Sequence, residues 1–273
     1  MLRAPSKRVD SHSLLSRGAR AHSVLGAILL FTGCFFSLPD QADPKAAADA
    51  ASEGGNGRAY ADEVLADAPL AYWRFDETSG STVVDATGKT TPGNLQGTPK
   101  LGEPGLGAGS RYSIRFDGKS GVATPLVIPD DAFTLEAIVQ PASFPRYESG
   151  IFCSETFKVN GFRMGVINNA IFRFWTDESG GAGNVQTNDR TAALGVKVHV
   201  AVTKEGSVVK IYLNGALGGQ GTVTMVPSPT QLTIATTNLS NPFDGQIDEP
   251  AVYGVALSEQ RILGHARAAH FAP

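Results

Sequence analysis

The residue types best suited to binding a ligand lie in and around a loop that follows Trp175. This loop, residues 176–189, is rich in glycine and carries short polar side chains, including Asn184 and Asn188. An exposed aromatic ring can stack on the face of a sugar, and short amide side chains can bind its hydroxyl groups. The combination predicts a glycan site here. The alternative, that Trp175 packs between two sheets, stays open on the sequence alone.

Further aromatic rings lie at the ends of predicted strands and could extend this site. They are Phe144, Tyr147 and Phe157, and Asp177 adds a carboxylate in the loop. The predicted ligand-binding residues are Trp175, Tyr147, Phe144, Asn184 and Asn188. The second tryptophan, Trp73, lies within an alternating strand pattern, which predicts a place in the core.

Histidine-based catalysis has little support in this chain. His12 and His22 lie in the N-terminal segment, and His265 and His270 lie in a predicted terminal helix and the tail after it. Only His199 lies within a predicted strand, in the largely apolar run 196–200, which predicts a packed, hydrogen-bonded side chain. The motifs of phosphate-binding loops, Cys-x-x-Cys sites and His-Glu-x-x-His sites do not occur.

The elements that must position these residues are short strands separated by turns. In residues 133–139 apolar side chains alternate with Thr134 and Glu136, which predicts a strand with one buried face. Asn168-Asn169 and Asn214-Gly215 are typical of tight hairpin turns. About a dozen such strands and two short helices, at 60–66 and 257–267, predict an all-β sandwich of two antiparallel sheets. Ser258 precedes the second helix, where its side chain can cap the first turn.

Length and charge narrow the possible functions. A chain of 273 residues with 42% hydrophobic and 18% charged residues suits one folded domain plus extra sequence. Residues 1–23 contain five of the 23 Lys and Arg and one of the 26 Asp and Glu, so 18 basic and 25 acidic residues leave a charge of −7 on the remainder. An acidic domain of this kind lacks the electrostatic footprint of a nucleic-acid-binding protein.

The N-terminus has the pattern of a targeting segment. The basic residues are followed by the apolar run 24–38, which is short for a membrane span and typical of a signal sequence. Phe31-Thr32-Gly33-Cys34 resembles a bacterial lipobox, in which Cys34 would be lipidated, whereas residues 48–50 offer an ordinary cleavage site. An uncleaved anchor is a third possibility. We therefore predict a signal, lipoprotein signal or anchor at 1–38, a flexible linker at 39–59, and a location outside the cell or at the surface of a bacterial envelope. Membrane contact would come only through this signal or lipid anchor.

Five short motifs follow one another in a specific order and spacing. They are Tyr72-Trp73-Arg74, Phe116-Asp117-Gly118, the run 133–137, Tyr212-Leu213-Asn214-Gly215 and Ile247-Asp248-Glu249. Over residues 60–267 the chain therefore resembles the laminin-G-like domains of the concanavalin A-like lectin/glucanase superfamily. The resemblance implies a jelly roll of two antiparallel sheets with a short C-terminal helix, spanning residues 60–268 and followed by a tail at 269–273.

Cys153, in a predicted strand, would be a small buried side chain.

The same resemblance allows a test for glycosidase activity. Glucanases of this superfamily place their acids on one strand with the spacing Glu-x-Asp-x-x-Glu, and retaining hydrolysis needs two neighbouring carboxyl groups. The matching stretch here is residues 246–251, in which Gln246 and Ala251 replace the two glutamates. The missing acids predict a protein that is not an enzyme.

The resemblance also suggests a structural calcium ion. The first and last strands of such jelly rolls run side by side, which could bring Asp76 or Glu77 near Asp248, with Asp117 at a strand end as a third ligand. Calcium prefers six to eight oxygen ligands of this kind. The alternative is that these acids cap turns and pair with Arg74 or Arg115.

Taken together, these features predict a noncatalytic surface module that binds a glycan or a surface protein, and the resemblance adds a structural Ca²⁺ to this expectation. A structural or adhesive module with no small-molecule ligand is the main alternative. A glycoside hydrolase is disfavoured by the missing acids.

Overall fold

The computed structural model describes residues 59–144, 148–156, 160–168, 170–176, 183–188, 191–236 and 242–272, which all belong to one compact unit. The predicted targeting segment with Cys34, nearly all of the linker, and Tyr147, Phe157 and Asp177 lie outside the described residues. Within the described parts of the chain, no helix combines the length and the apolar character needed to cross a membrane.

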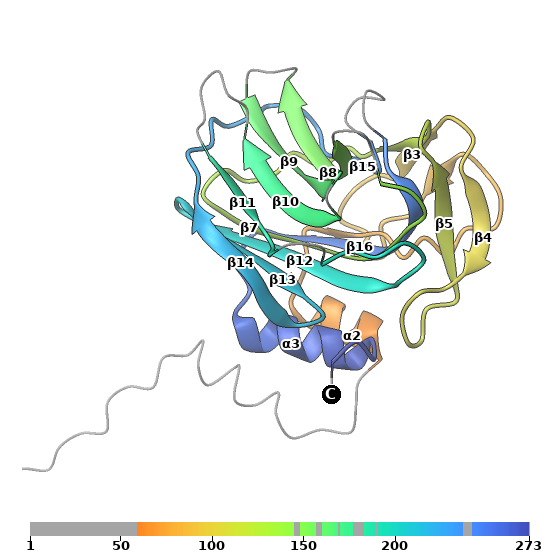
Figure 1. Cartoon of the computed structure of the whole chain (residues 1–273). Helices are drawn as coiled ribbons and strands as arrows, with labels where there is room; N and C mark the ends of the chain where they lie inside the picture. Colours follow the sequence, from red (N-terminus) through yellow and green to blue (C-terminus); the bar gives the residue numbers. More distant parts are fainter. Residues whose placement is uncertain are drawn as a thin grey trace, which may run out of the picture. The chain divides into compact units, whose positions relative to one another are not determined.

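Two antiparallel sheets form the predicted sandwich (Figure 1). The first sheet has the strand order β14 (Ala216–Thr222), β13 (Val208–Leu213), β12 (Val198–Glu205), β7 (Ala132–Pro141), β16 (Asp244–Tyr253), β5 (Tyr112–Asp117) and β4 (Lys100–Pro104), and β1 (Ala71–Tyr72) also pairs with β16. The second sheet has the order β11 (Asn184–Gln186), β10 (Ile171–Thr176), β9 (Asn160–Ile167), β8 (Glu148–Thr156), β15 (Thr233–Ile234), β6 (Gly121–Ala123), β3 (Gly93–Gln96) and β2 (Thr82–Val83).

The main hydrophobic core fills the space between the two sheets. In β7 the alternating residues Phe133, Leu135, Ala137 and Val139 point into this core, as their spacing predicts. Trp73 is fully buried in the same core, and Cys153 is also buried, so both predictions are confirmed.

Two helices, α2 (Tyr60–Ala66) and α3 (Glu259–Ala268), lie on the outer face of the first sheet (Figure 1). Ser258 caps α3, because its hydroxyl oxygen accepts a hydrogen bond of 3.3 Å from the backbone N–H of Arg261. Apolar side chains of the helices and of the sheet form a second cluster, with Tyr60 and Ile262 among its members. This cover buries β7 on both faces, so the prediction that its polar side faces solvent was wrong.

A glycine-rich edge strand brings the two sheets together at one side of the sandwich. Strand β14 approaches β11 so closely that a Cβ atom on Gly219 would lie 2.2 Å from the carbonyl oxygen of Gln186. A Cβ atom on Gly221 would lie 3.0 Å from the side chain of Val185. Because only glycine permits this approach, β14 fixes the position of β11 and of the side chains that β11 carries.

Candidate ligand-binding site

Strand β10 separates its side chains cleanly between the core and the outer face of the second sheet. Phe172 and Phe174 belong to the core, so Arg173 and Trp175 lie on the opposite face. Trp175 pairs in register with Arg163 on β9 and with Asn184 on β11. The predicted pairing of a ring with an amide therefore occurs across two neighbouring strands.

Trp175 is half-buried and lies outside both hydrophobic clusters. Among the described aromatic side chains, Tyr112 is the other ring that belongs to neither cluster, and the guanidinium of Arg111 lies 5.0 Å from its centre. Most of the remaining described rings are buried, and Phe144 and Phe271 pack against a cluster. The structure thus favours the surface placement of Trp175 over the core placement that the sequence left open.

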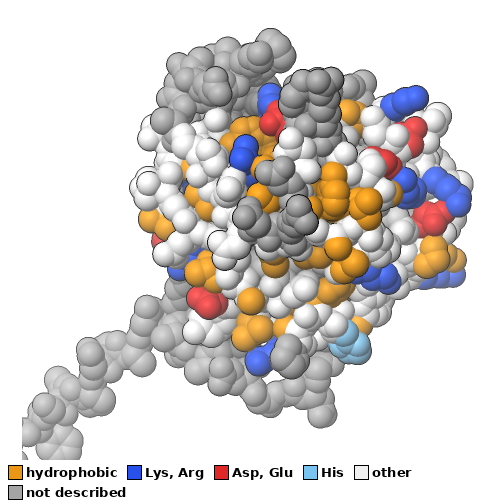
Figure 2. Space-filling view, in the orientation of Figure 1, with side chains coloured by type: hydrophobic (Ala, Val, Ile, Leu, Met, Phe, Trp, Pro, Cys, Tyr) orange, Lys and Arg blue, Asp and Glu red, His pale blue; other side chains and the backbone are white. Residues whose placement is uncertain are grey.

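Charged and polar groups surround Trp175 on this outer face. Arg163 forms an ion pair with Glu148 of β8. The Nε and Nη2 atoms of Arg173 both donate hydrogen bonds to the side-chain oxygen of Gln186, at 3.2 and 2.7 Å. Figure 2 shows basic and hydrophobic side chains next to one another over the region where Figure 1 places β9 and β10. Such a mixture of ring, amide and guanidinium groups suits a polar ligand with a flat apolar face.

Among the other predicted ligand-binding residues that the structure describes, Asn184 lies beside Trp175 on this face, and Asn188 and Phe144 lie away from it. Asn184 and Asn188 are both exposed, the first within β11 and the second just beyond it. Phe144 is partly buried and packs against the core between the sheets, so its ring faces the interior. The sequence reasoning missed Arg173 and Gln186, although Arg173 alternates with Phe172 and Phe174 and so has the parity of a surface residue.

The three acids predicted to bind calcium do not form one cluster: Asp76 lies near enough to Asp248 to raise its pKa, whereas Asp117 lies apart from both. Asp76 accepts a hydrogen bond of 3.0 Å from the backbone N–H of Tyr112, at the start of β5. Asp117 lies at the other end of that strand and caps a turn, where it accepts bonds from the backbone N–H of Lys119 and the hydroxyl of Ser120. The described residues contain no group of three or more His, Cys, Asp or Glu side chains that could hold a metal ion.

Asp248 is buried beneath the loop that precedes β5. One carboxylate oxygen accepts hydrogen bonds of 2.7 Å from the backbone N–H of Leu106 and from the hydroxyl of Ser110. The other oxygen is buried without a hydrogen-bond partner among the described residues. Burial and the negative charge of Glu249 raise the pKa of Asp248 to about 8, so this side chain is largely neutral at pH 7.

A second buried acid, Glu136, holds the helices on the first sheet. Its carboxylate lies 2.8 Å from Nε2 of His199 and 2.9 Å from Nδ1 of His265, and it accepts hydrogen bonds from the hydroxyls of Tyr60 and Tyr253. Burial by itself would raise the pKa of Glu136, but the charge of His265 and the bonds from both histidines hold it well below its usual value. The packed, hydrogen-bonded role predicted for His199 is confirmed, since this side chain is fully buried.

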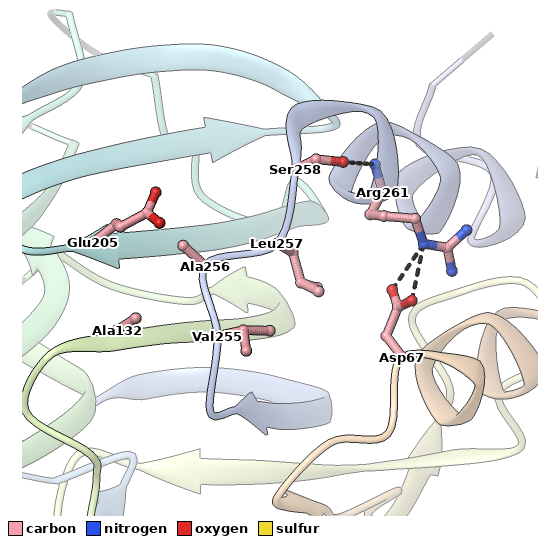
Figure 3. Close-up of a pocket in the computed structure, with 8 residues that line it drawn as sticks. All are labelled: Asp67, Ala132, Glu205, Val255, Ala256, Leu257, Ser258 and Arg261. Atoms are coloured by element: carbon pink, nitrogen blue, oxygen red, sulfur yellow. Dashed lines mark hydrogen bonds and ion pairs between the residues drawn. The ribbon is translucent and has the colours of Figure 1, made fainter. Parts of the chain in front are cut away.

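A pocket of about 420 Å³ opens where α3 begins. Figure 3 shows the apolar side chains of Val255 and Leu257 between Glu205 on one side and the Arg261–Asp67 pair on the other. Nε of Arg261 donates to both oxygens of Asp67, at 3.0 and 2.9 Å, and Nη2 donates to Glu63 at 2.8 Å. Because two carboxylates already neutralise this guanidinium, the pocket offers no free positive charge to an anionic ligand.

Several solved structures share this arrangement of sheets. Domain 4 of AbnA, an extracellular arabinanase from Geobacillus stearothermophilus solved in complex with arabinotriose, has a TM-score of 0.57 and 20% identity, covering 72% of this chain and 98% of that domain. A Trypanosoma rangeli sialidase has a TM-score of 0.57 and 17% identity, covering 75% of this chain. The binding domain of botulinum neurotoxin serotype D has a TM-score of 0.56 and 11% identity, also covering 75% of this chain.

These likenesses establish the fold. The match spans 34% of the sialidase and 52% of the neurotoxin domain, so this chain corresponds to only a part of either protein. No curated protein gives a significant sequence match to the chain. The sequence profile that does match, over residues 116–263, is that of Laminin_G_3, described as the concanavalin A-like lectin/glucanases superfamily. Since this match covers more than half of the chain and agrees with the two-sheet sandwich, the protein belongs to the Laminin_G_3 family of the concanavalin A-like lectin/glucanase superfamily.

Proposed function

We propose that this protein is a noncatalytic module that binds glycans through the outer face of the second sheet, at strands β10 and β11. The observation that carries the proposal is the position of Trp175. Its ring is half-buried on the outer face, apart from both hydrophobic clusters, and it pairs in register with the exposed Asn184. Rings that contribute nothing to the core and stand beside amides are well placed to stack on a sugar.

The proposal that the module is noncatalytic rests on the acids of β16. Gln246 stands where a glucanase of this fold has a carboxylate, and its amide donates a hydrogen bond of 3.0 Å to the hydroxyl of Ser113. The neighbouring acids Asp248 and Glu249 are almost fully buried. A glycosidase needs two carboxyl groups that both reach the scissile bond of a bound sugar, and these two acids have no access to one.

A glycan ligand also accords with one of the structural neighbours. Domain 4 of AbnA was solved with arabinotriose bound, and almost the whole length of that domain matches this chain. At 20% identity the likeness extends to the fold alone, so it raises the expectation of a sugar ligand without specifying which sugar. We further propose that the N-terminal segment places the module outside the cell or on the bacterial surface.

Two variants of adjacent residues test the proposal. Trp175→Ala should abolish binding to the glycans that the wild-type protein retains on a glycan array, while the melting temperature stays nearly unchanged. Phe174→Ala is the matched control, because Phe174 is fully buried and stacks on Phe162 with the ring centres 5.2 Å apart. Its removal should cost about 3–5 kcal/mol of stability.

Two results would contradict the proposal. A large loss of stability in Trp175→Ala would make this ring a packing residue. Binding of no glycan by the wild-type protein would favour the alternative of a structural or adhesive module, or of a module with a protein ligand.

A further inference from the structure

Arg173 has the geometry of an anion-binding group. It lies on the outer face of β10, two residues before Trp175, and is partly exposed. Its Nε and Nη2 atoms converge on one oxygen, the side-chain oxygen of Gln186, at 3.2 and 2.7 Å. Among the described residues, no Asp or Glu forms an ion pair with Arg173, whereas the neighbouring Arg163 pairs with Glu148.

A carboxylate would be a better partner for this guanidinium than the amide of Gln186. Hydrogen bonds between two charged groups are roughly twice as strong as neutral ones, and the planar guanidinium fork matches the two oxygens of a carboxylate. Gln186 is exposed, so its amide can be displaced into water at little cost. The fork is therefore oriented by a neutral neighbour and remains available to a stronger acceptor.

The residue opposite Arg173 on the neighbouring strand β9 has no side chain. The residue that pairs with Arg173 on β9 is Gly165. A Cβ atom on Gly165 would lie 1.8 Å from the carbonyl oxygen of Ser149, so this position accepts only glycine. As a result, the neighbouring strand contributes no side chain beside Arg173 at this position.

We propose that the ligand of this site is an acidic sugar, whose ring stacks on Trp175 while its carboxylate binds the guanidinium of Arg173. This inference rests on the proposed glycan-binding function and specifies the chemical class of the glycan. Residues two apart in a strand lie roughly 6.6 Å from each other on one face. The flexible arginine side chain covers the remaining distance to a carboxylate at the edge of a stacked ring.

The overall charge of the domain makes this recognition a local property. Residues 60–268 carry 16 basic and 21 acidic side chains, a charge of −5, so the domain as a whole repels polyanions. Binding of an acidic glycan must then come from the Arg173–Trp175 pair rather than from general attraction. A polyanion without sugar rings should accordingly fail to bind.

Three uronic-acid polymers test the inference: polygalacturonate, alginate and hyaluronan. Each is compared with its methyl-esterified form, which keeps the sugar rings and removes the charge. Isothermal titration calorimetry on the full chain should show at least one acidic polymer binding at least about tenfold more tightly than its ester, as expected for a charge-assisted contact. Polyglutamate serves as the control for a polyanion without sugar.

Three variants assign the preference for the acidic polymer to Arg173 and the binding of the sugar ring to Trp175. Arg173→Gln should bind the acidic polymer and its ester with equal affinity, and Arg173→Lys should restore the preference only in part, because lysine keeps the charge and loses the fork. Trp175→Ala should lose binding to both forms. Unchanged melting temperatures of all three variants would show that folding is intact.

The outcomes distinguish this inference from the function on which it rests. Equal affinity for acid and ester, binding of a neutral glycan alone, or equal binding of polyglutamate would overturn the acidic-sugar inference while leaving a glycan-binding or surface-binding role. A preference for the acid that persists in Arg173→Gln would also overturn it. Failure of the wild-type protein to bind any glycan would overturn both proposals.

Discussion

Replacing Glu136 by glutamine tests how the two terminal helices are held on the first sheet. The variant Glu136→Gln keeps the shape of the side chain and removes its charge. Glu136 is fully buried and contacts side chains from α2, β12, β16 and α3. Breaking a buried, hydrogen-bonded charge pair by removing one partner costs about 3–5 kcal/mol. We therefore expect the free energy of unfolding at pH 7 to fall by about 3 kcal/mol.

The pKa of His265 gives an independent measure of the same interaction. Burial would lower this pKa, but the charge of Glu136 and a hydrogen bond with Asp67 raise it from 6.5 to about 9. A difference of this size between the folded and unfolded pKa corresponds to roughly 3 kcal/mol. Because the folded pKa is the higher one, this stabilisation is fully present below pH 6.5 and is lost as the pH rises through 9.

Urea denaturation of both proteins between pH 6 and pH 9.5 measures this effect. The wild-type free energy of unfolding should fall across that range, and the fall should be smaller in Glu136→Gln, where His265 keeps only its contact with Asp67. The control is Glu205→Gln, which removes an exposed acid from the end of β12. Equal stability of Glu136→Gln and wild type at pH 7, or equal pH dependence, would refute the reasoning.

Three further predictions follow from the buried acids and from the glycine approach. Burial and the charge of Glu249 raise the pKa of Asp248 to about 8, so its stabilising proton is lost as the pH rises through 8. Asp248→Asn has no such proton to lose. Urea denaturation at pH 9 should therefore show the variant to be more stable than wild type by at least about 1 kcal/mol. If Ca²⁺ binds near Asp76 and Asp248, EDTA should lower the melting temperature by mass action, and Asp117→Asn should leave that difference unchanged, because Asp117 lies at the far end of β5. Gly219→Ala would place a Cβ atom 2.2 Å from the carbonyl oxygen of Gln186; scanning calorimetry should show a melting temperature lower by at least about 2–4 °C, and titration should show weaker glycan binding.

The fold and several local features followed from the sequence because they depend on neighbouring residues. Alternation in residues 133–139 identified a strand and the side of it that faces the core, since side chains of a strand point to opposite faces. Ser258 was recognised as a helix cap because a cap requires only a short side chain before the first turn. The order and spacing of the five family motifs predicted the two-sheet sandwich as a whole.

The positions of the polar residues depended on contacts between distant parts of the chain. Glu136 looked like the solvent-facing residue of a half-buried strand, yet it meets Tyr60, 76 residues away, and His265, 129 residues away. No local pattern encodes that two helices from opposite ends of the domain cover the same sheet. As a consequence, a buried network of charged side chains lies on the face of β7 that the alternation predicted to be exposed to solvent.

The candidate site shows the same division between local pattern and tertiary contact. The sequence placed Trp175 in a strand beside a polar loop, and left open which face its ring would occupy. The packing of Phe172 and Phe174 between the sheets decides this, because Trp175 and Arg173 alternate with them and therefore lie on the outer face. The approach of β11, permitted by the glycines of β14, then brought Gln186 to Arg173 and Asn184 to Trp175. A strand pattern fixes which side chains share a face, but only the packing of the sheets decides which face is open to a ligand.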